Sequence, residues 1–556
     1  MKKTLFSLII LAWGGIVSMA APVERIYVST DRDVYLAGDV IWCSLSSLDE
    51  NGRFSNASAV SYLELVSGDG TACTAKIGLL DGRGAGSFRI PVTAPTGTYR
   101  LVAYTAVNAA EDGTPWQAGS RLLTIFNSTS RARVADGVEI LDEGTYEARK
   151  PAQAAPEGSL ELSTRIRLPK DSPAVINLHN PGGKASVSLS VFHDDDLLPA
   201  DRENTPASFL KALPASIDLK KDVSTENDGE IISTRLRGTI LKGDDISFAT
   251  LSTAGSPSDL FIGRSDGDDR IRFYTSNIYG NREIVCEVYQ LDRKEGYIDF
   301  ESPFLYPEIG PLPKLRLSPA QKTDLRARKA ALRAEKALRI DTLTTFMAHR
   351  EDLLLASVAM RRYHLDDYTR FPSVKEVIVE IAKELHLRKE DGKPVITLSY
   401  SDGLGRKFDR TENILVMMDG VVISDLNLLL DFDAMLIDDI DIYNEAIVCG
   451  KTPLHGIVDF ITKKNYVTAL HFPANVRVVD FQGVAYPVAY TGAVPEGEVQ
   501  DLRQLLYWHP ILQLDTDSNL RLEFNTPGYA GRFKAVAEGF TDDGKPIYQE
   551  FTFEVE

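Results

Sequence analysis

The sequence is poor in the residues that build most recognisable reaction centres. Its 556 residues include only four cysteines and eight histidines. His-Glu-x-x-His, Gly-x-Ser-x-Gly, Walker and Gly-x-Gly-x-x-Gly motifs are all absent, and the cysteines lack the spacing of a zinc ribbon. We therefore expect no enzyme, no metal and no cofactor. Because catalytic triads assemble from distant positions, a hydrolase with dispersed site residues stays open as an alternative.

Long apolar runs are absent beyond the N-terminus. Lys2 and Lys3 precede an apolar stretch from Leu5 to Val17, and Ser18-Met19-Ala20 supplies small residues for cleavage. These features predict a signal peptide at 1–20. No other stretch reaches the roughly 18 apolar residues of a transmembrane helix. We expect an exported chain, in the periplasm or associated with the outer membrane. Its net charge of −18 argues against nucleic acid as a partner.

The cysteines leave one question of covalent structure open. Cys43 and Cys73 fall in one predicted sandwich, where a disulfide would stabilise the fold by about 3–4 kcal/mol in an oxidising compartment. The alternative is that both are buried thiols. Cys286 and Cys449 fall in separate predicted domains, so we interpret them as core residues.

Short alternating runs of apolar and polar residues, separated by Gly, Asp and Pro turns, fill residues 24–126. Strands at this spacing indicate a β-sandwich. Within it, Asp31-Arg32-Asp33-Val34-Tyr35-Leu36-Ala37-Gly38-Asp39 and Thr96-Gly97-Thr98-Tyr99-Arg100-Leu101 resemble the opening segment and the exit hairpin of macroglobulin-like domains. The resemblance implies a fibronectin-like module of the α2-macroglobulin family at 21–126. The Cys-Gly-Glu-Gln thioester that protease trapping requires is absent from the chain.

Further strand patterns and one change of period divide the rest of the chain. We predict a mainly β, multidomain fold with tandem fibronectin- or macroglobulin-like β-sandwiches. The predicted domains after the first are a second β-sandwich at 127–225, a third at 226–308, a helical linker at 309–372, a small α/β domain at 373–466 and a C-terminal β-sandwich at 467–556.

The linker begins with a helix-start signal, Ser318-Pro319. Residues from Ala320 to Thr345 lack Gly and Pro and predict a helix, and a second helical stretch is expected from Phe346 to Arg362. Ser373-Val374-Lys375-Glu376 is a capping box that predicts a helix to about His386.

The first linker helix is rich in cations. A helix with a solvated face is one interpretation, and a docking arm for an acidic partner or for an acidic face of the same chain is the other. The candidate docking residues are Lys322, Arg326, Arg328, Lys329, Arg333, Lys336 and Arg339. The acidic runs at Asp194-Asp195-Asp196 and Asp438-Asp439 predict solvated turns in preference to metal sites.

The segment from Ile414 to Lys464 carries three apolar strands with a distinctive order. They read Ile-Leu-Val-Met-Met-Asp-Gly-Val-Val-Ile-Ser-Asp, Ile-Asp-Asp-Ile-Asp-Ile-Tyr and Gly-Ile-Val-Asp-Phe-Ile-Thr-Lys-Lys. This series resembles the plug domain of TonB-dependent receptors, with Asp419, Gly420 and Gly456 as its motif residues. The Asp-Gly pair predicts a hairpin turn. A receptor barrel has about 22 strands, and we expect the stretch after Lys464 to be too short for one.

The whole chain resembles a family of exported Bacteroidetes proteins that combine a macroglobulin-like N-terminus with a plug-like domain and lack the barrel. Leu365-Asp366-Asp367-Tyr368-Thr369-Arg370-Phe371 and Asp501-Leu502-Arg503-Gln504-Leu505-Leu506-Tyr507-Trp508-His509-Pro510 also carry the resemblance. We expect a non-enzymatic binding or adaptor protein of the cell envelope, with a protein partner such as an outer-membrane protein. The alternatives are an accessory component of TonB-dependent uptake and the dispersed-site hydrolase.

Overall fold

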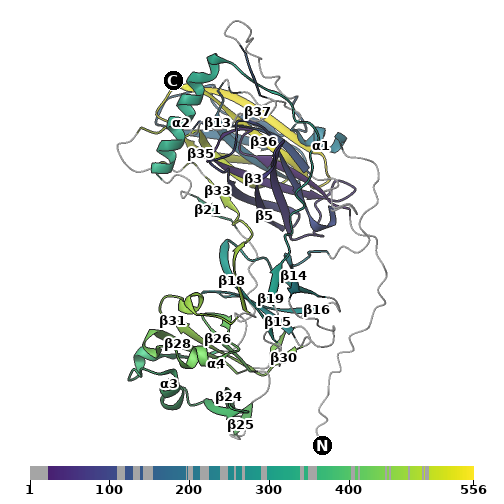
Figure 1. Ribbon diagram of the computed structural model, residues 1–556. Coiled ribbons are helices and arrows are strands. Elements are labelled where there is room, and N and C mark those ends of the chain that lie inside the picture. Colours follow the sequence, from purple (N-terminus) through teal and green to yellow (C-terminus); the bar gives the residue numbers. More distant parts are fainter. Residues whose placement is uncertain are drawn as a thin grey trace, which may run out of the picture.

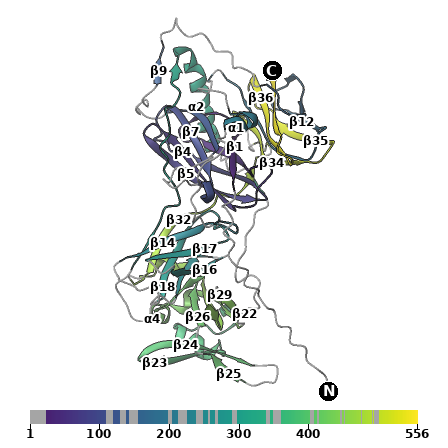
Figure 2. The ribbon, with the colours of Figure 1, turned by 90° about the vertical axis from the view of Figure 1, so that its right-hand side faces the viewer.

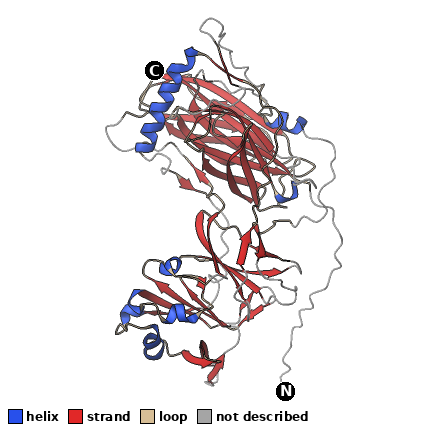
Figure 3. Cartoon of the chain, viewed as in Figure 1, coloured by secondary structure: helices blue, strands red, loops and turns tan. Residues whose placement is uncertain are grey.

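The fold is built mainly from β-strands, as the sequence predicted (Figure 3). The predicted signal peptide lies outside the described residues. Among the residues that are described, no helix is both long and apolar enough to cross a membrane. The computed structural model describes residues 23–108, 119–128, 138–141, 155–195, 197, 204–212, 225–237, 248–255, 258–265, 269–289, 297–338, 344–347, 360–401, 407–410, 414–444, 447–449, 452–473, 476–490, 492, 494 and 500–556.

The first strands of the chain form a β-sandwich, the N-terminal sandwich. Its strand order is β1-β3-β6-β5-β4-β7-β8-β2, in which the long β5 pairs with β6 at one end and with β4 along the rest. Alternating residues such as Ile41, Leu63 and Leu101 fill its core. The strands are β1 (Arg25–Thr30), β2 (Val34–Leu36), β3 (Val40–Leu48), β4 (Val60–Ser67), β5 (Gly70–Leu80), β6 (Arg83–Arg89), β7 (Gly97–Tyr104) and β8 (Gly119–Phe126).

A second sandwich is assembled from two distant parts of the chain. β13 hydrogen-bonds to β34 on one side and to β36 on the other, and β12 pairs with β35. This pairing corrects the prediction of separate sandwiches at 127–225 and 467–556, because alternation identifies a strand without identifying its partner. The strands are β10 (Glu161–Ser163), β11 (Arg167–Leu168), β12 (Pro173–Asn180), β13 (Ala185–His193), β34 (Leu505–Leu514), β35 (Ser518–Asn525), β36 (Gly531–Thr541) and β37 (Pro546–Val555).

The N-terminal sandwich and the second sandwich pack against each other through buried polar groups. The Tyr27 hydroxyl donates to Glu538 at 2.7 Å, and Arg121 Nη1 donates to the same carboxylate at 2.9 Å. The Tyr27 ring meets Phe540 edge-on at 5.3 Å. The earliest and latest strands therefore lie side by side, purple against yellow in Figures 1 and 2.

A third sandwich also takes a strand from later in the chain. Its strand order is β19-β14-β17-β16-β15-β18-β32, so the prediction of a self-contained domain at 226–308 omitted β32. Cys286 is fully buried in its core, which confirms the interpretation of that thiol. The strands are β14 (Ile231–Arg237), β15 (Phe248–Thr253), β16 (Leu260–Ser265), β17 (Arg270–Tyr274), β18 (Asn281–Tyr289), β19 (Tyr297–Phe300) and β32 (Val476–Gln482).

In its described residues, the linker between the third sandwich and the α/β domain departs from the predicted helices, and residues 339–343 and 348–359 of those helices lie outside the described set. After a short 3-10 turn, α2 (Lys322–Ala337) forms, but it ends well before Thr345. Thr345 and Phe346 instead form β21, which pairs with β33 (Val488–Ala489). Met360 starts a strand where a helix was expected to continue. Helix propensity was overridden here by backbone pairing with a distant segment.

The α/β domain contains a sheet of order β22-β28-β31-β26-β27, so it begins at Met360 and not at residue 373. The capping box at Ser373 is confirmed, since Ser373 accepts from the Glu376 N–H and donates to its carboxylate. The helix it opens, α3 (Val374–Glu380), ends before the predicted His386, which lies in β23. The other elements are β22 (Met360–His364), β23 (Leu385–Glu390), β24 (Lys393–Ser401), β25 (Lys407–Arg410), β26 (Ile414–Met418), β27 (Val421–Val422), α4 (Leu426–Leu430), β28 (Ile437–Tyr443) and β31 (Gly456–Thr462).

The chain returns from the α/β domain through residues 476–490, which we call the returning segment. After β32, the Val484 N–H donates to Ile278 O of the third sandwich at 2.7 Å, and the Ala485 N–H donates to Lys76 O of the N-terminal sandwich at 2.8 Å. Tyr490 then exchanges two backbone hydrogen bonds with Trp508 of the second sandwich. One short segment therefore connects all three sandwiches.

Candidate functional site

One face of the α/β sheet carries a row of charged side chains. The strand register sets Arg362 of β22 opposite Asp441 of β28, and Asp441 opposite Asp459 of β31. His364 lies opposite Asp439 in the same register. The other face is apolar and belongs to the domain core, with Tyr363, Ile440, Ile442, Val458 and Phe460.

Charge in this row is only partly balanced. Arg362 donates to both oxygens of Asp441, at 2.7 and 2.6 Å. Burial raises the pKa of Asp459 to about 7, against the lowering effect of the Gly420 N–H, and the carboxylates of Asp419 and Asp441 add to the rise. Burial and the neighbouring carboxylates therefore favour the protonated form of Asp459 over the charged one.

The Asp419-Gly420 hairpin turn predicted from the sequence is confirmed. Both residues have positive φ, 48° and 81°, and Met418 pairs with Val421 across the turn. The Asp419 carboxylate accepts from the Thr462 N–H at 2.6 Å, from the Thr462 hydroxyl at 2.6 Å and from the Val467 N–H at 3.2 Å. This aspartate is structural, because it ties the turn to the end of β31.

The third sandwich covers this turn. A Cβ added at Gly420 would lie 2.1 Å from Ser258 Cβ, and the Gly255 N–H donates to Asp419 O at 3.0 Å. Gly456 is also tightly packed, since an added Cβ would lie 2.6 Å from Leu398 Cδ2. The three plug-like motif residues therefore lie in contacts within the chain.

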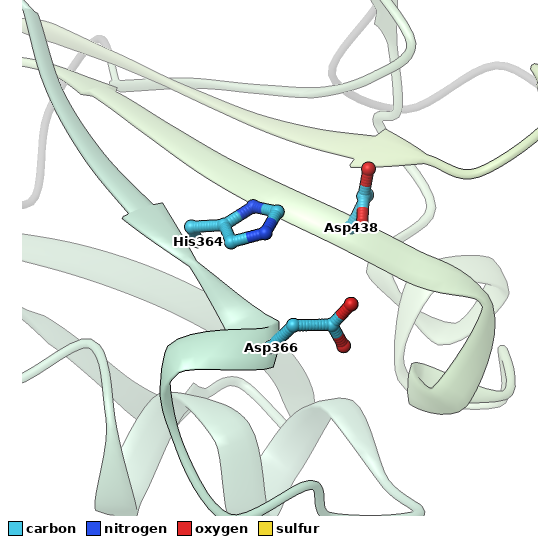
Figure 4. Close-up of side chains that lie close together, drawn as sticks. All are labelled: His364, Asp366 and Asp438. Carbon is cyan, nitrogen blue, oxygen red and sulfur yellow. The ribbon is translucent and has the colours of Figure 1, made fainter.

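His364, Asp366 and Asp438 converge at the exposed end of the charged row (Figure 4). One ligand atom from each residue lies within 4.8 Å of the others, a spacing that can hold a divalent cation. His364 Nδ1 already lies 2.6 Å from Asp439 Oδ1, and this hydrogen bond raises the pKa of His364. Asp438 and Asp439 belong to β28, so the predicted solvated turn is corrected.

A serine and a histidine meet elsewhere in this domain. His386 Nε2 lies 2.9 Å from Ser399 Oγ across the β23–β24 hairpin. The Ser399 hydroxyl donates to Glu384 O at 3.3 Å. Because a hydroxyl has one proton, Ser399 then accepts from the histidine ring and is not deprotonated by it. In an activated nucleophile the histidine would accept the serine proton, whereas here the histidine donates to the serine.

Helix α2 presents cations on one side. Lys322, Arg326, Lys329, Arg333 and Lys336 recur every three or four residues, so they share a helical face. Lys329 Nζ donates to Ser128 O. The other four are exposed, and we call them the exposed stripe. Arg339 lies outside the described residues.

Arg328 departs from the predicted set of docking cations. It is 6% exposed, and it donates to Asp195 Oδ1 at 3.0 Å and to Val34 O at 2.7 Å. Leu325 and Leu332 pack beside it against the N-terminal sandwich. The buried side of α2 thus docks on an acidic residue of the same chain, and Asp195 is no solvated turn residue. The sequence could not show this, because the partners are far apart along the chain.

Cys43 and Cys73 are both free thiols, so the disulfide alternative is not formed in this structure. Cys43 is fully buried, and burial raises the pKa of Cys73 to about 12. Both therefore behave as protonated core residues. Cys449 forms part of β29 (Ile447–Cys449), but its side chain lies outside the described set.

Comparisons with known proteins leave the chain without an assigned family. No protein-family model matches it, and no curated protein does. Among solved structures, Salmonella alpha-2-macroglobulin reacted with methylamine matches 98% of this chain and 40% of its own, with 9% identity and a TM-score of 0.23. Trypsin-activated alpha-2-macroglobulin from Escherichia coli matches 98% of this chain and 42% of its own, with 10% identity and a TM-score of 0.24. The Yersinia pseudotuberculosis adhesin InvE matches 50% of this chain and 58% of its own, with 11% identity and a TM-score of 0.13. TM-scores of this size do not establish a common fold.

Proposed function

We propose that the protein is a non-enzymatic binding or adaptor protein of the cell envelope that acts through protein–protein contacts. The exposed stripe on α2 carries the proposal. Four cations lie along one face of a helix in a chain whose net charge is −18. Such a local concentration of charge favours association with an acidic surface and speeds it.

The way α2 is held supports a binding role for its outer face. Arg328 and the leucines beside it fix the opposite side of the helix to the N-terminal sandwich. A helix that is already anchored loses little conformational entropy when a partner binds. The predicted signal peptide and the resemblance to macroglobulin- and plug-containing exported proteins support a place in the envelope, with an outer-membrane protein as partner.

The experiment compares two full-length variants with equal changes of charge. The stripe variant replaces Lys322, Arg326, Arg333 and Lys336 with glutamine. The control variant replaces four exposed lysines of the α/β domain, Lys375, Lys383, Lys389 and Lys393, with glutamine. Each is affinity-purified from detergent-solubilised envelopes of cells that make the protein. We expect a partner that the wild type and the control retain and the stripe variant loses. Equal recovery by both variants would contradict the proposal.

An accessory role in TonB-dependent uptake is the second candidate, and it draws on the plug-like sequence of the α/β domain. Because the sheet starts at β22, a deletion that tests this role must remove 360–473 rather than the motif region alone. Loss of nutrient uptake in cells that carry the deletion would support the role. Unchanged uptake, with the truncated protein present in the envelope, would contradict this accessory role.

A further inference from the structure

The molecule has two lobes that are joined by a narrow junction (Figures 1 and 2). We call them the upper lobe, with the N-terminal sandwich, the second sandwich and α2, and the lower lobe, with the third sandwich and the α/β domain. The chain first enters the lower lobe through residues 225–230 and finally leaves it through the returning segment. Groups buried in this junction therefore determine how firmly the two lobes are held together.

Residues 225–230 carry a buried polar contact between the lobes. The Tyr62 hydroxyl of β4 donates to Glu226 Oε1 at 2.8 Å. Lys76 of β5 donates to both oxygens of Glu230, at 2.7 and 2.8 Å. Glu226 is 4% exposed and Glu230 is 2% exposed. Two carboxyl groups of the lower lobe are therefore buried against the N-terminal sandwich.

The two carboxyl groups are balanced unequally. Lys76 is the cation whose charge favours ionised Glu226, but its ammonium is hydrogen-bonded to both oxygens of Glu230. Glu226 Oε1 accepts from the Tyr62 hydroxyl and from the Ile231 N–H at 2.9 Å. Glu226 Oε2 is buried and has no hydrogen-bond partner in the described part of the chain. An ionised Glu226 is therefore poorly compensated, and burying such a charge is costly.

This environment favours the neutral carboxylic acid. Burial raises the pKa of Glu226 to about 8, and the charge of Glu230 adds to the rise. The Ile231 N–H, the Tyr62 hydroxyl and the charge of Lys76 act in the opposite direction. Burial also raises the pKa of Tyr62 far above its ordinary value, so the phenol keeps its proton in this range. A carboxyl group with a raised folded-state pKa weakens its contact increasingly as pH climbs from the ordinary pKa toward the raised one.

Two clefts border the junction and limit the area over which the lobes touch. One has a volume of about 540 Å³ and is lined by both lobes, with Leu80 from the upper and Tyr279 from the lower. The other, of about 490 Å³, is lined by Ser87 of the upper lobe and Asn281 of the lower. Because the lobes are not packed together along their whole boundary, the buried contact at residues 225–230 carries a large share of the junction.

We propose that Glu226 is a proton switch in the junction between the two lobes. With its proton, Glu226 is a neutral acid that accepts from Tyr62 and Ile231 and keeps residues 225–230 on the N-terminal sandwich. When a base in the solvent takes the proton, the buried carboxylate favours an opened junction in which water reaches it. The inference goes beyond the proposed function, because the switch works in the same way whichever partner binds the exposed stripe.

Hydrogen exchange of the full-length protein, read by mass spectrometry from pH 6 to pH 9, tests the switch. The Ala59 N–H donates to Glu226 O at 2.7 Å and the Ile231 N–H donates to Glu226 Oε1, so both amides report on this contact. The Ala485 N–H donates to Lys76 O across the junction and reports on the opening of the junction as a whole. After correction for the intrinsic exchange rate at each pH, we expect opening at these amides to rise by up to about tenfold per pH unit between pH 6 and pH 8, and then to level off.

Two variants and a control separate the switch from ordinary packing. Glu226→Gln keeps the acceptor oxygen but cannot ionise, so the rise should be smaller by up to about tenfold per pH unit. The slope that remains belongs to Glu230, whose pKa is also raised by burial. Tyr62→Phe removes a hydrogen bond that favours ionised Glu226, so opening should level off at a higher pH than in the wild type. Glu523→Gln, an equal change of charge at an exposed position, should follow the wild type.

Three results would overturn the inference. The first is opening in the wild type that stays constant between pH 6 and pH 8. The second is a rise in Glu226→Gln equal to that in the wild type. The third is a rise at Ala59 and Ile231 without one at Ala485, which would make the change local to residues 225–231. If Glu226→Gln lowers the melting temperature at every pH, the Tyr62→Phe variant decides the matter, and an unchanged levelling pH in that variant would overturn the inference.

Discussion

A buried ion pair lies in the interface between the N-terminal and third sandwiches, and its removal gives a sharp prediction. Lys76 Nζ donates to both oxygens of Glu230, at 2.7 and 2.8 Å. The two side chains are only 2% and 3% exposed. Lys76 also lies 4.0 Å from the centre of the Phe481 ring on the returning segment. Three separate parts of the chain thus meet at one ammonium group.

Lys76→Met keeps the aliphatic bulk and removes the charge. Glu230 is then left buried without its cation, and breaking a buried pair in this way costs about 3–5 kcal/mol. Replacing both members with apolar residues removes the uncompensated charge. The double variant Lys76→Met with Glu230→Met should therefore recover most of the lost stability.

The loss should depend on pH. Burial raises the pKa of Glu230 even with Lys76 present, since it outweighs the lowering effect of the ammonium. Without that ammonium the folded-state pKa rises further above the unfolded value. A carboxyl with a raised folded pKa destabilises the fold increasingly as pH rises from the unfolded pKa toward the folded one. The deficit of Lys76→Met should be smaller at pH 5 than at pH 7.5.

Hydrogen exchange read by mass spectrometry is the suitable assay, because a protein with several modules need not unfold in one step. We expect protection of β5 and of the start of β14 to fall by about 100-fold or more at pH 7.5. The matched control is Lys184→Met, whose partner Asp515 lies 3.6 Å away with both side chains well exposed. Its effect should stay within about 0.5 kcal/mol. The reasoning is refuted if Lys76→Met behaves like this control, or if the double variant is no more stable than the single one.

Three further predictions concern the α/β domain. Asp419→Asn removes part of the acceptor that holds the Thr462 N–H and hydroxyl, and should cost about 1–3 kcal/mol in thermal unfolding; an unchanged melting temperature would contradict the structural role. Asp459→Asn should leave stability nearly unchanged at pH 4 and raise it at pH 8.5, because the folded-state pKa of Asp459 is raised to about 7 and the destabilisation grows from the unfolded pKa up to that value; equal effects at both pH values would contradict this. Asp439→Asn should lower the pKa of His364 toward its ordinary value, measured by NMR titration of the ring, and no shift would show that the hydrogen bond does not set it.

Local signals in the sequence predicted local structure well. The Asp419-Gly420 turn and the Ser373 capping box are each set by residues within a few positions, and both formed as predicted. Such features depend on side-chain and backbone preferences that act within one turn or one strand.

Long-range pairing could not be predicted from the same signals. His193 pairs with Phe533 across more than half the chain, and nothing in either strand specifies the other. The basic pattern of α2 likewise predicts an exposed helix face, but it does not show that Arg328 turns inward to Asp195. In both cases the deciding interaction lies between segments whose separation in sequence hides it.

The pairing of early with late strands changes how the α/β domain should be regarded. The chain builds the N-terminal sandwich, begins the second and third sandwiches, forms the α/β domain, and then completes the third and the second in reverse order. The α/β domain is therefore an insertion whose exit strand, β32, is also a strand of the third sandwich. The next few residues of the returning segment bind β5, where the Ala485 N–H donates to Lys76 O. A force or a partner that shifts the α/β domain acts on this segment through continuous backbone, so the domain and the N-terminal sandwich share a mechanical connection that separate tandem domains would lack.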